Sequence, residues 1–375
     1  MEVLVVFLFA VYFGFLACVF IGWKRTLATR RQILNHTPLV SIVIAARNEG
    51  NNISALLKDI LKQSYDKFEV IVVDDHSTDN THGEITALSL DNPRIKVANS
   101  VGHGKKYALS RGLQLAGGEI IVTTDADCHV QRHWLEAMIS YFQHKETMMV
   151  IGAVKIGGST AFAKLQAHEF LSLTATSAAT LSWAIPSMCN GANLAFRKSA
   201  FEAVGGYHGS LHVASGDDQF LMHKIQSYFG DAIRFAADER CTVTTKPCFS
   251  TREFFHQRIR WAGKWRVQKS MYTTVLSVFI FSFHCMIISL PACVLMNWVD
   301  PLVAGGLVVL KVLGEWTLLS SVARFVGLKW NLLAFLGLQI IYSPYAAFIG
   351  LTSGFMPFEW KGRRIKTASV RAAEL

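Results

Sequence analysis

Ile120-Ile-Val-Thr-Thr-Asp-Ala-Asp-Cys128 is the stretch around which this chain is organised. Its first residues are β-branched and predict a short buried strand, and Asp125 and Asp127 follow where that strand ends. In an open α/β sheet, ligands bind just beyond the carboxyl ends of the strands. Residues two apart in an extended segment point to the same side, so both carboxylates can face one ligand. Paired carboxylate oxygens suit a hard divalent cation such as Mg²⁺ or Mn²⁺.

A single Asp-x-Asp is common in solvated turns, so the meaning of this one depends on the segments around it. Short β-branched runs alternate here with stretches that carry apolar residues at helical spacing. The pattern predicts strands over residues 40–45, 69–73, 94–97 and 120–123, and helices over 51–63, 77–90 and 105–116. Strands that alternate with helices indicate parallel βαβ units with right-handed crossovers. We therefore expect this half to bind a nucleotide at its strand ends.

The second half of the chain is less regular. It predicts helices over residues 160–181, 201–207 and 216–226, and strands within 186–196, 233–236 and 242–245. The segment 251–267 carries aromatic and apolar residues on one helical face and basic and polar residues on the other. Such a helix is typical of an element that lies on a membrane surface, and the alternative is an ordinary amphipathic core helix.

The N-terminal run from residue 3 to residue 23 has no charged residue and is long enough to cross a hydrocarbon core of ~30 Å. A cleaved signal peptide is the alternative, but no Lys or Arg precedes the run and no small-x-small site precedes the basic residues after it. Basic residues come directly after the run: Lys24, Arg25, Arg30 and Arg31. The positive-inside rule then predicts an integral membrane protein whose next domain is cytoplasmic.

Three further apolar stretches cover residues 273–298, 302–319 and 332–355. The second contains Lys311 and Glu315, which are four residues apart and can neutralise each other on a helix. If all three stretches cross the membrane, the basic tail lies on the wrong side for the charge rule. We therefore expect the stretch that contains Pro344 to be broken or re-entrant.

The net charge of +10 and the hydrophobic content of 51% limit the class of partner. The basic residues gather beside apolar segments, at 24–31, 258–269 and 361–371, which favours anionic lipid head groups over nucleic acid. None of the 7 cysteines forms a C-x-x-C pair, so neither a zinc site nor a disulfide framework is indicated. A reducing compartment fits this pattern.

Five short motifs occur in order along the chain: Ser41-Ile-Val-Ile-Ala-Ala-Arg-Asn-Glu49, Val72-Val-Asp-Asp-His-Ser-Thr-Asp79, Asp125-Ala-Asp127, Ser215-Gly-Asp-Asp218 and Gln257-Arg-Ile-Arg-Trp261. Together they resemble the inverting family-two glycosyltransferases with the GT-A fold. The resemblance is to the membrane-bound branch with Q-x-x-R-W, which includes cellulose and hyaluronan synthases and ceramide glucosyltransferases. It implies an α/β, Rossmann-like nucleotide-diphospho-sugar transferase domain with transmembrane helices at both ends.

The resemblance divides the chain into an anchor (1–24), a GT-A domain (38–250), an interfacial helix (251–270), C-terminal membrane segments (273–356) and a basic tail (357–375). It implies that a nucleotide-sugar donor is bound by residues of several motifs: Glu49, Asp74 or Asp75, Lys105, Asp125, Gln257 and Arg260. Asp127 would bind the metal directly, and Asp125 would contact the metal or the ribose. The neighbouring Lys106 is expected to be a solvated surface charge.

By the same resemblance, Asp218 is the catalytic base and Asp217 its acidic neighbour. Two like charges side by side raise one pKa, which helps a base to work near neutral pH. Their alternative role is the ordinary enrichment of Asp at a helix N-terminus. Because Asp127, Asp218 and Arg260 are far apart in sequence, we expect a structure to bring them to one cleft near the membrane.

Acceptor binding is implied for Trp261, which offers a flat apolar face, and for Asn190 and Asn193. Trp261 is alternatively a core or interface tryptophan, and both asparagines are alternatively turn residues that bond their own backbone.

The resemblance implies transfer of a sugar from a nucleotide-sugar donor, a UDP-linked one, to a membrane lipid or lipid-linked glycan, with Mg²⁺ or Mn²⁺ as cofactor. A processive polysaccharide synthase is the alternative reading. A nucleotidyltransferase or a non-catalytic membrane scaffold is more remote.

Overall fold

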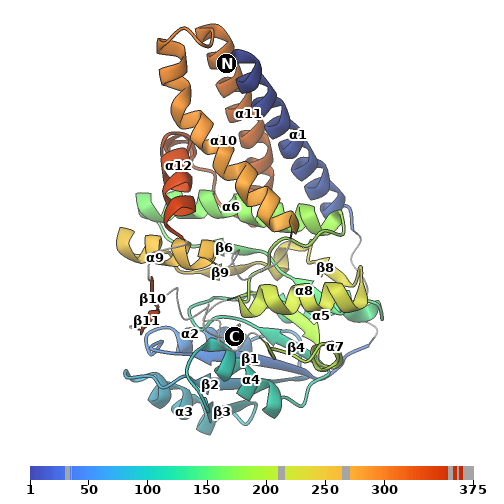
Figure 1. Ribbon diagram of the computed structural model, residues 1–375. Helices are drawn as coiled ribbons and strands as arrows, with labels where there is room; N and C mark the ends of the chain where they lie inside the picture. The colour runs from blue at the N-terminus through green and yellow to red at the C-terminus, as the bar shows by residue number, and fades with distance from the viewer. Residues whose placement is uncertain are drawn as a thin grey trace.

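The structure is a computed structural model that describes residues 1–29, 34, 36–209, 216–263, 271–353, 358–360 and 363–365. An α/β domain lies at the bottom of Figure 1 and a helical bundle at the top. Two helices, α6 (Ala161–Ser182) and α9 (Thr251–Ala262), lie between them. The chain therefore has a junction layer that can be reached from both the domain and the bundle.

The largest sheet in the described residues has 7 strands in the order β3-β2-β1-β4-β7-β5-β8. Its strands are β1 (Val40–Ala46), β2 (Phe68–Asp74), β3 (Ile95–Asn99), β4 (Ile120–Thr123), β5 (Met149–Ile151), β7 (Leu194–Arg197) and β8 (Ile233–Phe235). Strand β1 pairs in parallel with β2 and β4, and β2 pairs in parallel with β3. Strand β7 is antiparallel to both β4 and β5. The predicted parallel half is confirmed, and β5 was not predicted.

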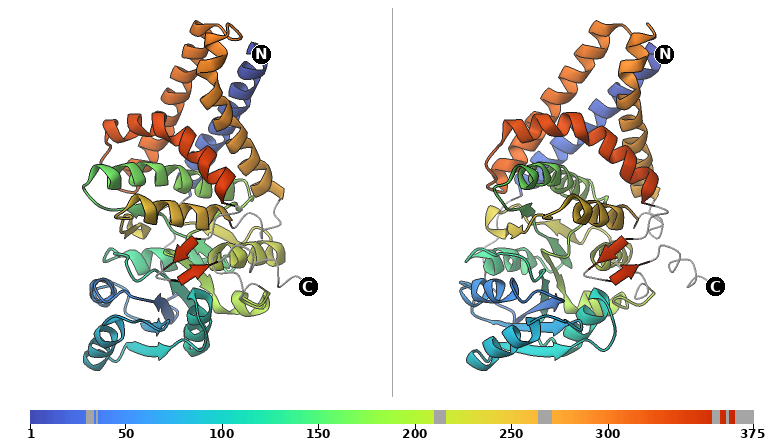
Figure 2. Two further views of the ribbon diagram at one scale, coloured as in Figure 1. Left: turned by 60° about the vertical axis from the view of Figure 1, so that its left-hand side comes forward. Right: turned by 90° about the vertical axis from the view of Figure 1, so that its left-hand side faces the viewer.

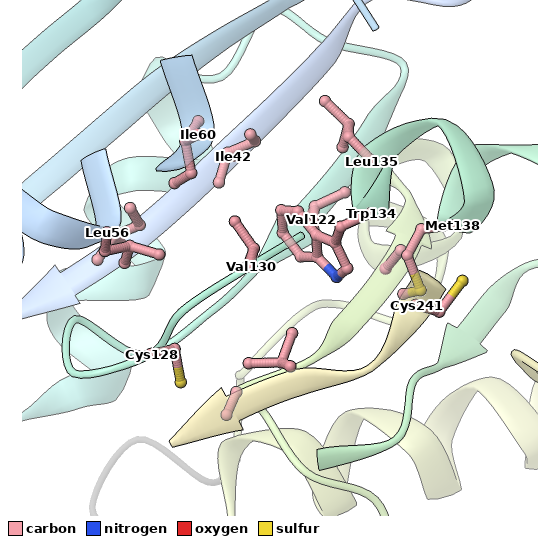
Figure 3. Close-up of a cluster of buried hydrophobic side chains, with 14 of the residues drawn as sticks. Ile42, Leu56, Ile60, Val122, Cys128, Val130, Trp134, Leu135, Met138 and Cys241 are labelled. Carbon is pink, nitrogen blue, oxygen red and sulfur yellow. The ribbon is translucent and has the colours of Figure 1, made fainter. Parts of the chain in front are cut away.

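Helices cover both faces of this sheet. They include α2 (Ile53–Leu61), α3 (Thr81–Asp91), α4 (Lys105–Leu115), α5 (Trp134–Ser140) and α8 (Asp217–Phe229). Successive residues of a strand point to opposite faces. Accordingly Ile42 packs in the layer that contains α2 and α5, whereas Val43 packs in the layer that contains α4. Figure 3 shows the first layer, where Ile42 and Val122 of the sheet lie near Leu56 of α2 and Trp134 of α5.

A second, two-stranded sheet joins β6 (Val154–Ile156) in parallel with β9 (Val243–Thr245). The short helices α7 (Lys198–Ala203), η1 (Tyr141–Gln143) and η2 (Glu239–Cys241) complete the domain as described. Strand β6 and helix α5 were not predicted. Strand β9 ends at Thr245, which lies beside the loop that follows β4.

Three helices of the bundle run together away from the α/β domain: α1 (Glu2–Leu27), α10 (Met271–Leu295) and α11 (Pro301–Phe325) (Figure 1). At the far end, the carboxylate of Glu2 accepts a hydrogen bond from the Asp300 N–H at 2.8 Å. At the near end, the indole N–H of Trp23 donates to the Ser321 hydroxyl at 3.1 Å. Among the described residues, 4 helices are long and apolar enough to cross a membrane, the fourth being α12.

Helix α12 (Leu332–Thr352) takes a different course from the other three. It arches across α6 (Figure 2) and contains Pro344, whose ring bends a helix because it removes a backbone donor. The hairpin of β10 (Phe358–Trp360) and β11 (Arg363–Ile365) then lies on the side of the α/β domain. The helix is continuous rather than broken, so the predicted break at Pro344 is wrong.

The aromatic face of α9 packs against protein. The ring of Phe254 lies 5.5 Å from that of Tyr345, and the ring of Phe255 lies 5.4 Å from that of Phe348, both on α12. Residues 264–267 of the predicted helix lie outside the described residues. Over its described part, α9 therefore resembles the core-helix alternative more than a helix exposed to lipid.

Candidate active site

A cavity of ≈ 1150 Å³ lies between the α/β domain, the junction helices and the bundle. All but two of the predicted site residues line it: Glu49, Asp75, Lys105, Asp125, Asp127, Asn190, Asp217, Asp218, Gln257, Arg260 and Trp261. They come from the loops after β1, β2 and β4, from the loop before β7, and from α4, α8 and α9. Asp127, Asp218 and Arg260 thus line one cavity, as the motif order predicts.

Asp125 and Asp127 follow β4, whose end is fixed by a hydrogen bond from the Thr123 hydroxyl to the Gly191 carbonyl at 2.9 Å. Both carboxylates are half-buried and line the cavity. The Thr245 hydroxyl donates to Asp127 Oδ2 at 3.4 Å, a contact that no sequence feature indicated. Two carboxylates that share a cavity wall provide the hard oxygen ligands that Mg²⁺ and Mn²⁺ prefer, so these residues fit such an ion.

Lys105, the first residue of α4, reaches the same carboxylates. Its Nζ lies 2.6 Å from Asp125 Oδ1 and 3.7 Å from Asp217 Oδ2. Burial alone would lower the pKa of Lys105, but Asp125 and Asp217 raise it above its ordinary value. The lysine is therefore held charged at the centre of an acidic group.

Lys106 does not have the solvated position that the sequence predicted. It is 4% exposed, and its Nζ lies 4.7 Å from the centre of the Phe220 ring. The long aliphatic stem of a lysine can be buried when its charged end lies over an aromatic face. Consecutive residues on α4 thus point one charge into the cavity and the other towards α8.

Asp217 and Asp218 begin α8 and are each 8% exposed. Asp218 accepts hydrogen bonds from the N–H groups of Gly191 at 2.9 Å and Gln219 at 2.8 Å. A Cβ added to Gly191 would lie 3.3 Å from both Lys105 Nζ and Asp217 Oδ2. A glycine therefore allows the backbone to approach these charged groups closely. Ser215, the first residue of this motif, lies outside the described residues.

The structure separates the two aspartates that follow β2. Asp75 lines the cavity and accepts the Gly104 N–H at 3.0 Å, just before α4. Asp74 does not line it and instead accepts from the backbone N–H of Ser77 at 3.2 Å and from the Ser77 hydroxyl. Of the two alternatives left open by the sequence, the geometry favours Asp75 as a donor ligand. Glu49 lines the cavity and accepts from the Asn52 amide at 2.6 Å.

Arg260, on α9, lines the same cavity as the acidic group. Burial lowers the pKa of Arg260, and the carboxylates of Asp125, Asp217 and Asp218 act on it in the opposite direction. An arginine keeps its charge in such a place because its intrinsic pKa is far above neutrality. The cavity therefore brings the cations of Lys105 and Arg260 together with its carboxylates, a charge pattern that suits a metal-bound diphosphate.

Residues 41–205 match the family described as Glycosyl transferase family 2. These matching residues form a family-two glycosyltransferase domain. It is 29% identical over 246 residues to a beta-monoglucosyldiacylglycerol synthase of Nostoc sp., a match that covers 62% of this chain and 50% of that protein. It is 27% identical over 227 residues to a poly-beta-1,6-N-acetyl-D-glucosamine synthase of Staphylococcus aureus, covering 60% of this chain and 53% of that protein. The chain thus spans about half the length of these curated relatives.

A solved structure has the same fold over the whole chain. It is the mannosyltransferase PcManGT from Pyrobaculum calidifontis in complex with GDP-Man and Mn²⁺, with a TM-score of 0.56 and 19% identity. The likeness covers 100% of this chain and 97% of that one. The predicted GT-A fold with additional apolar helices is therefore confirmed.

The two junction helices are joined by a buried ion pair that sequence reasoning missed. Arg258 on α9 donates through Nε to Glu169 Oε1 on α6 at 3.0 Å, and its Nη2 contacts the other oxygen. Tyr345 on α12 also donates to Glu169, at 3.2 Å. Arg258 is 3% exposed and Glu169 7%. Arg258 occupies a variable position of Q-x-x-R-W, and nothing in the local pattern marks Glu169.

Gln257 and Trp261 of the Q-x-x-R-W motif lie beside this pair. The Gln257 side chain accepts from Arg258, and the Trp261 ring lies 4.4 Å from the Arg258 guanidinium. The Trp261 ring also lies 5.9 Å from Phe170 on α6. Trp261 thus combines a cavity-lining position with the packing role left open by the sequence.

Asn190 and Asn193 have different environments in the glycosyltransferase domain. Asn190 lines the cavity, and its side-chain oxygen accepts the Ala192 N–H at 3.0 Å, as in an Asx turn. Asn193 is 0% exposed, and its amide is bonded to Ala153, Cys241 and Trp134. The amide N–H groups and the side-chain oxygen of Asn193 are all bonded within the core. Asn193 is therefore a structural residue and does not have the position predicted for acceptor binding.

Proposed function

We propose that this protein is a metal-dependent inverting glycosyltransferase that moves a sugar from a nucleotide-sugar donor to a hydroxyl of a membrane lipid or lipid-linked glycan. The observation that carries the proposal is the single cavity lined by Asp125, Asp127, Asp218 and Arg260, which continues between the apolar helices. In such a cavity, a nucleotide-sugar donor held beside the carboxylates and an acceptor held between the apolar helices can meet inside the protein. The names of the synthase relatives support this class of reaction.

Different residues of the cavity have different roles in the proposed reaction. Asp218 accepts the proton of the acceptor hydroxyl, whose oxygen then attacks the anomeric carbon from the face opposite the nucleotide. The N–H groups that bond Asp218 fix its carboxylate at the start of α8. Lys105 and Arg260 place positive charge beside the diphosphate that leaves. Asp75 and Glu49 lie at the strand ends, where the nucleoside of the donor would be held.

Asp125 and Asp127 are the residues that would hold Mg²⁺ or Mn²⁺. When bound, such an ion supplies a Lewis acid that takes up negative charge on the departing diphosphate. Lys105 and Arg260 act on the carboxylates of Asp125, Asp217 and Asp218, and a bound ion would add positive charge at the same cavity wall.

We also propose that the catalytic domain is cytoplasmic. Lys24 and Arg25 at the end of α1 and Arg324 at the end of α11 lie at the domain end of the bundle. The Lys155 ammonium on β6 donates to the Val326 carbonyl at 2.8 Å, which fixes the end of α11 against the domain. Basic residues at this end are typical of the cytoplasmic side.

A reconstitution experiment tests the proposal. Detergent-purified protein is incubated with Mn²⁺, a panel of labelled nucleotide sugars and total membrane lipid, and both diphosphate release and labelled lipid are measured. We expect one donor to give a labelled lipid whose anomeric configuration is inverted, with activity lost in EDTA and restored by Mg²⁺ or Mn²⁺. Absence of transfer from every donor, or retention of configuration, would reject the proposal.

A polysaccharide synthase remains the second candidate, because the cavity continues into the bundle as a product channel would. Product length separates the two: a ladder of glycan products favours the synthase, and a single added sugar favours lipid glycosylation.

A further inference from the structure

The cavity extends past α6 into the bundle, where residues of α1, α10, α11 and α12 line it. We call this part the membrane end of the cavity. Its wall is mostly aliphatic and aromatic, including Phe15, Leu16, Ile280, Leu318, Phe335 and Leu338. An apolar wall of this kind favours hydrocarbon chains over a hydrated glycan.

One polar cluster interrupts this wall. Lys311 and Glu315 on α11 form an ion pair at 2.8 Å, so the predicted mutual neutralisation is confirmed. Gln339 on α12 accepts from Lys311 at 2.9 Å and donates to Glu315 at 2.8 Å. Tyr12 on α1 donates its hydroxyl proton to Glu315. All four side chains line the membrane end of the cavity.

Charged side chains at membrane depth are costly, and those that persist usually mark a functional path. These four come from three helices and form a closed hydrogen-bonded network, which we call the polar cluster. It is neutral as a whole. Tyrosines aside, the described parts of these helices contribute three ionisable side chains to the cavity: His284, Lys311 and Glu315.

The neutrality of the polar cluster indicates which amphiphilic molecules can bind at the membrane end of the cavity. A phosphate group would need a cation without a partner, but Lys311 already pairs with Glu315. Between the membrane end and the carboxylates, Arg258 likewise pairs with Glu169. Uncharged hydroxyl, ester or amide groups can exchange hydrogen bonds with such a network without leaving an ion unpaired.

We propose that the membrane end of the cavity is the binding site for an uncharged lipid acceptor. Its hydrocarbon chains lie against the apolar wall, and its hydroxyl, ester or amide groups bond to the polar cluster. This inference rests on the proposed transfer to a lipid and narrows the acceptor from membrane lipids in general to uncharged ones.

Direct lipid binding tests this site. Radiolabelled 1,2-dioleoylglycerol is added to the full chain in detergent, and retained lipid is measured while unlabelled dioleoylglycerol, dioleoyl phosphatidic acid or a soluble oligosaccharide competes. The two lipids have the same chains and differ by a phosphate. We expect phosphatidic acid to compete at least about tenfold less well than dioleoylglycerol. Equal or better competition by phosphatidic acid or by the oligosaccharide overturns the proposal.

A matched pair of variants locates the binding. Leu338→Trp fills space at the cavity wall of α12, whereas Leu333→Trp adds the same volume to a side chain of α12 that is 81% exposed. We expect Leu338→Trp to weaken dioleoylglycerol binding about tenfold or more and Leu333→Trp to change it less than about twofold. Equal effects of the two substitutions overturn the location.

A third variant tests the polar cluster itself. Lys311→Met with Glu315→Leu removes both charges together, so no buried ion is left unpaired. We expect dioleoylglycerol binding to fall about tenfold. If this variant does not fold, Gln339→Leu, which retains the ion pair, takes its place with the same expected direction. Wild-type lipid binding in a folded variant shows that the cluster is not a lipid ligand.

Mn²⁺-dependent binding of the nucleotide sugar is measured on each preparation. If the lipid site is wrong, donor binding and turnover persist while lipid selectivity is absent. If the proposed transfer reaction is wrong, no nucleotide sugar is turned over, whatever the lipid result. The two failures are therefore distinguishable.

Discussion

Lys105 Nζ lies 2.6 Å from Asp125 Oδ1, so a lysine at the start of α4 neutralises one of the two carboxylates expected to hold the metal. The same ammonium is 3.7 Å from Asp217. One cation thus links the proposed metal ligands with the carboxylates at the start of α8. Its removal should affect the metal and the donor in opposite directions.

Lys105→Met is predicted to weaken nucleotide-sugar binding about tenfold, because a cation beside the diphosphate is lost. Binding of Mn²⁺ alone should strengthen about threefold, because the nearby carboxylates lose their competing partner. Calorimetry on detergent-purified protein measures both affinities. The control is Lys106→Met, which removes the same charge from a side chain directed at Phe220 and should change donor affinity less than about twofold. Parallel losses of metal and donor affinity in Lys105→Met would contradict this role.

Asp127→Asn is predicted to abolish Mn²⁺-dependent donor binding while the protein stays folded, since the amide is nearly isosteric but a much weaker ligand for a hard cation. Thermal stability, metal binding and sugar transfer are measured on one preparation. Asp66→Asn on the exposed surface is the charge-matched control and should behave as wild type. A folded Asp127→Asn protein with full activity would show that Asp-Ala-Asp is not the metal site.

Asp218→Asn is predicted to lower transfer to the acceptor by ~10²–10⁴, the usual contribution of a general base. An asparagine can still accept the Gly191 and Gln219 N–H groups, so thermal stability and donor affinity should stay near those of wild type. Asp217→Asn should be milder. Transfer and donor binding are measured side by side. Normal transfer by Asp218→Asn would reduce this residue to a helix-terminal charge.

The Arg258–Glu169 pair is predicted to behave as a buried ion pair. Arg258→Met or Glu169→Met alone should destabilise the protein by about 3–5 kcal/mol, because each leaves one buried charge without its partner. The double variant should be clearly more stable than either single variant. Thermal unfolding in detergent provides the comparison. Additive losses in the double variant would mean that the two side chains act independently.

Glu69 should contribute a pH-dependent part of the stability. Burial alone would raise the pKa of Glu69, but bonds from Lys96, Ser41 and the Gly117 N–H lower it below its usual value. The contribution is therefore present above the unfolded-chain pKa of about 4.3 and is lost as pH falls through the lower folded pKa.

Glu69→Gln should flatten the fall in melting temperature below about pH 4.5, and Glu202→Gln, at an exposed site, should not. Melting curves between about pH 6 and pH 3.5 measure this difference. If all three proteins share the same pH profile, the Glu69 carboxylate makes no such contribution.

Local pattern was sufficient for the parallel half of the sheet. Strands β1, β2, β3 and β4 were predicted to within about one or two residues, because each is a β-branched run next to an amphipathic helix. Strands β5 and β6 were missed, although β8 and β9, which also span three residues each, were predicted. The order β4-β7-β5-β8 was not predictable, because it depends on pairing between segments far apart in the chain.

The candidate site shows the same division. Motif order was enough to name Asp125, Asp127 and Asp218 as candidates, because their chemical type and their place after a strand or before a helix are local properties. It left Asp74 and Asp75 as alternatives, and the lining of the cavity distinguishes them. The predictions for Asn193 and Lys106 were corrected by the structure, in which both side chains are buried. A polar side chain can lie in the core wherever it finds bonding partners there, and the local sequence does not show those partners.

The sequence by itself determined the strands of the parallel half, the long apolar helices and the carboxylates at the strand ends, because periodicity and residue type act over a few neighbouring residues. Only the tertiary structure decided that Glu169 meets Arg258, 89 residues away, and that Tyr12, Lys311 and Gln339 close one network inside the bundle. It also decided that α12 arches over α6. These features depend on which distant surfaces exclude water from each other, and no local pattern records which partner a side chain will meet.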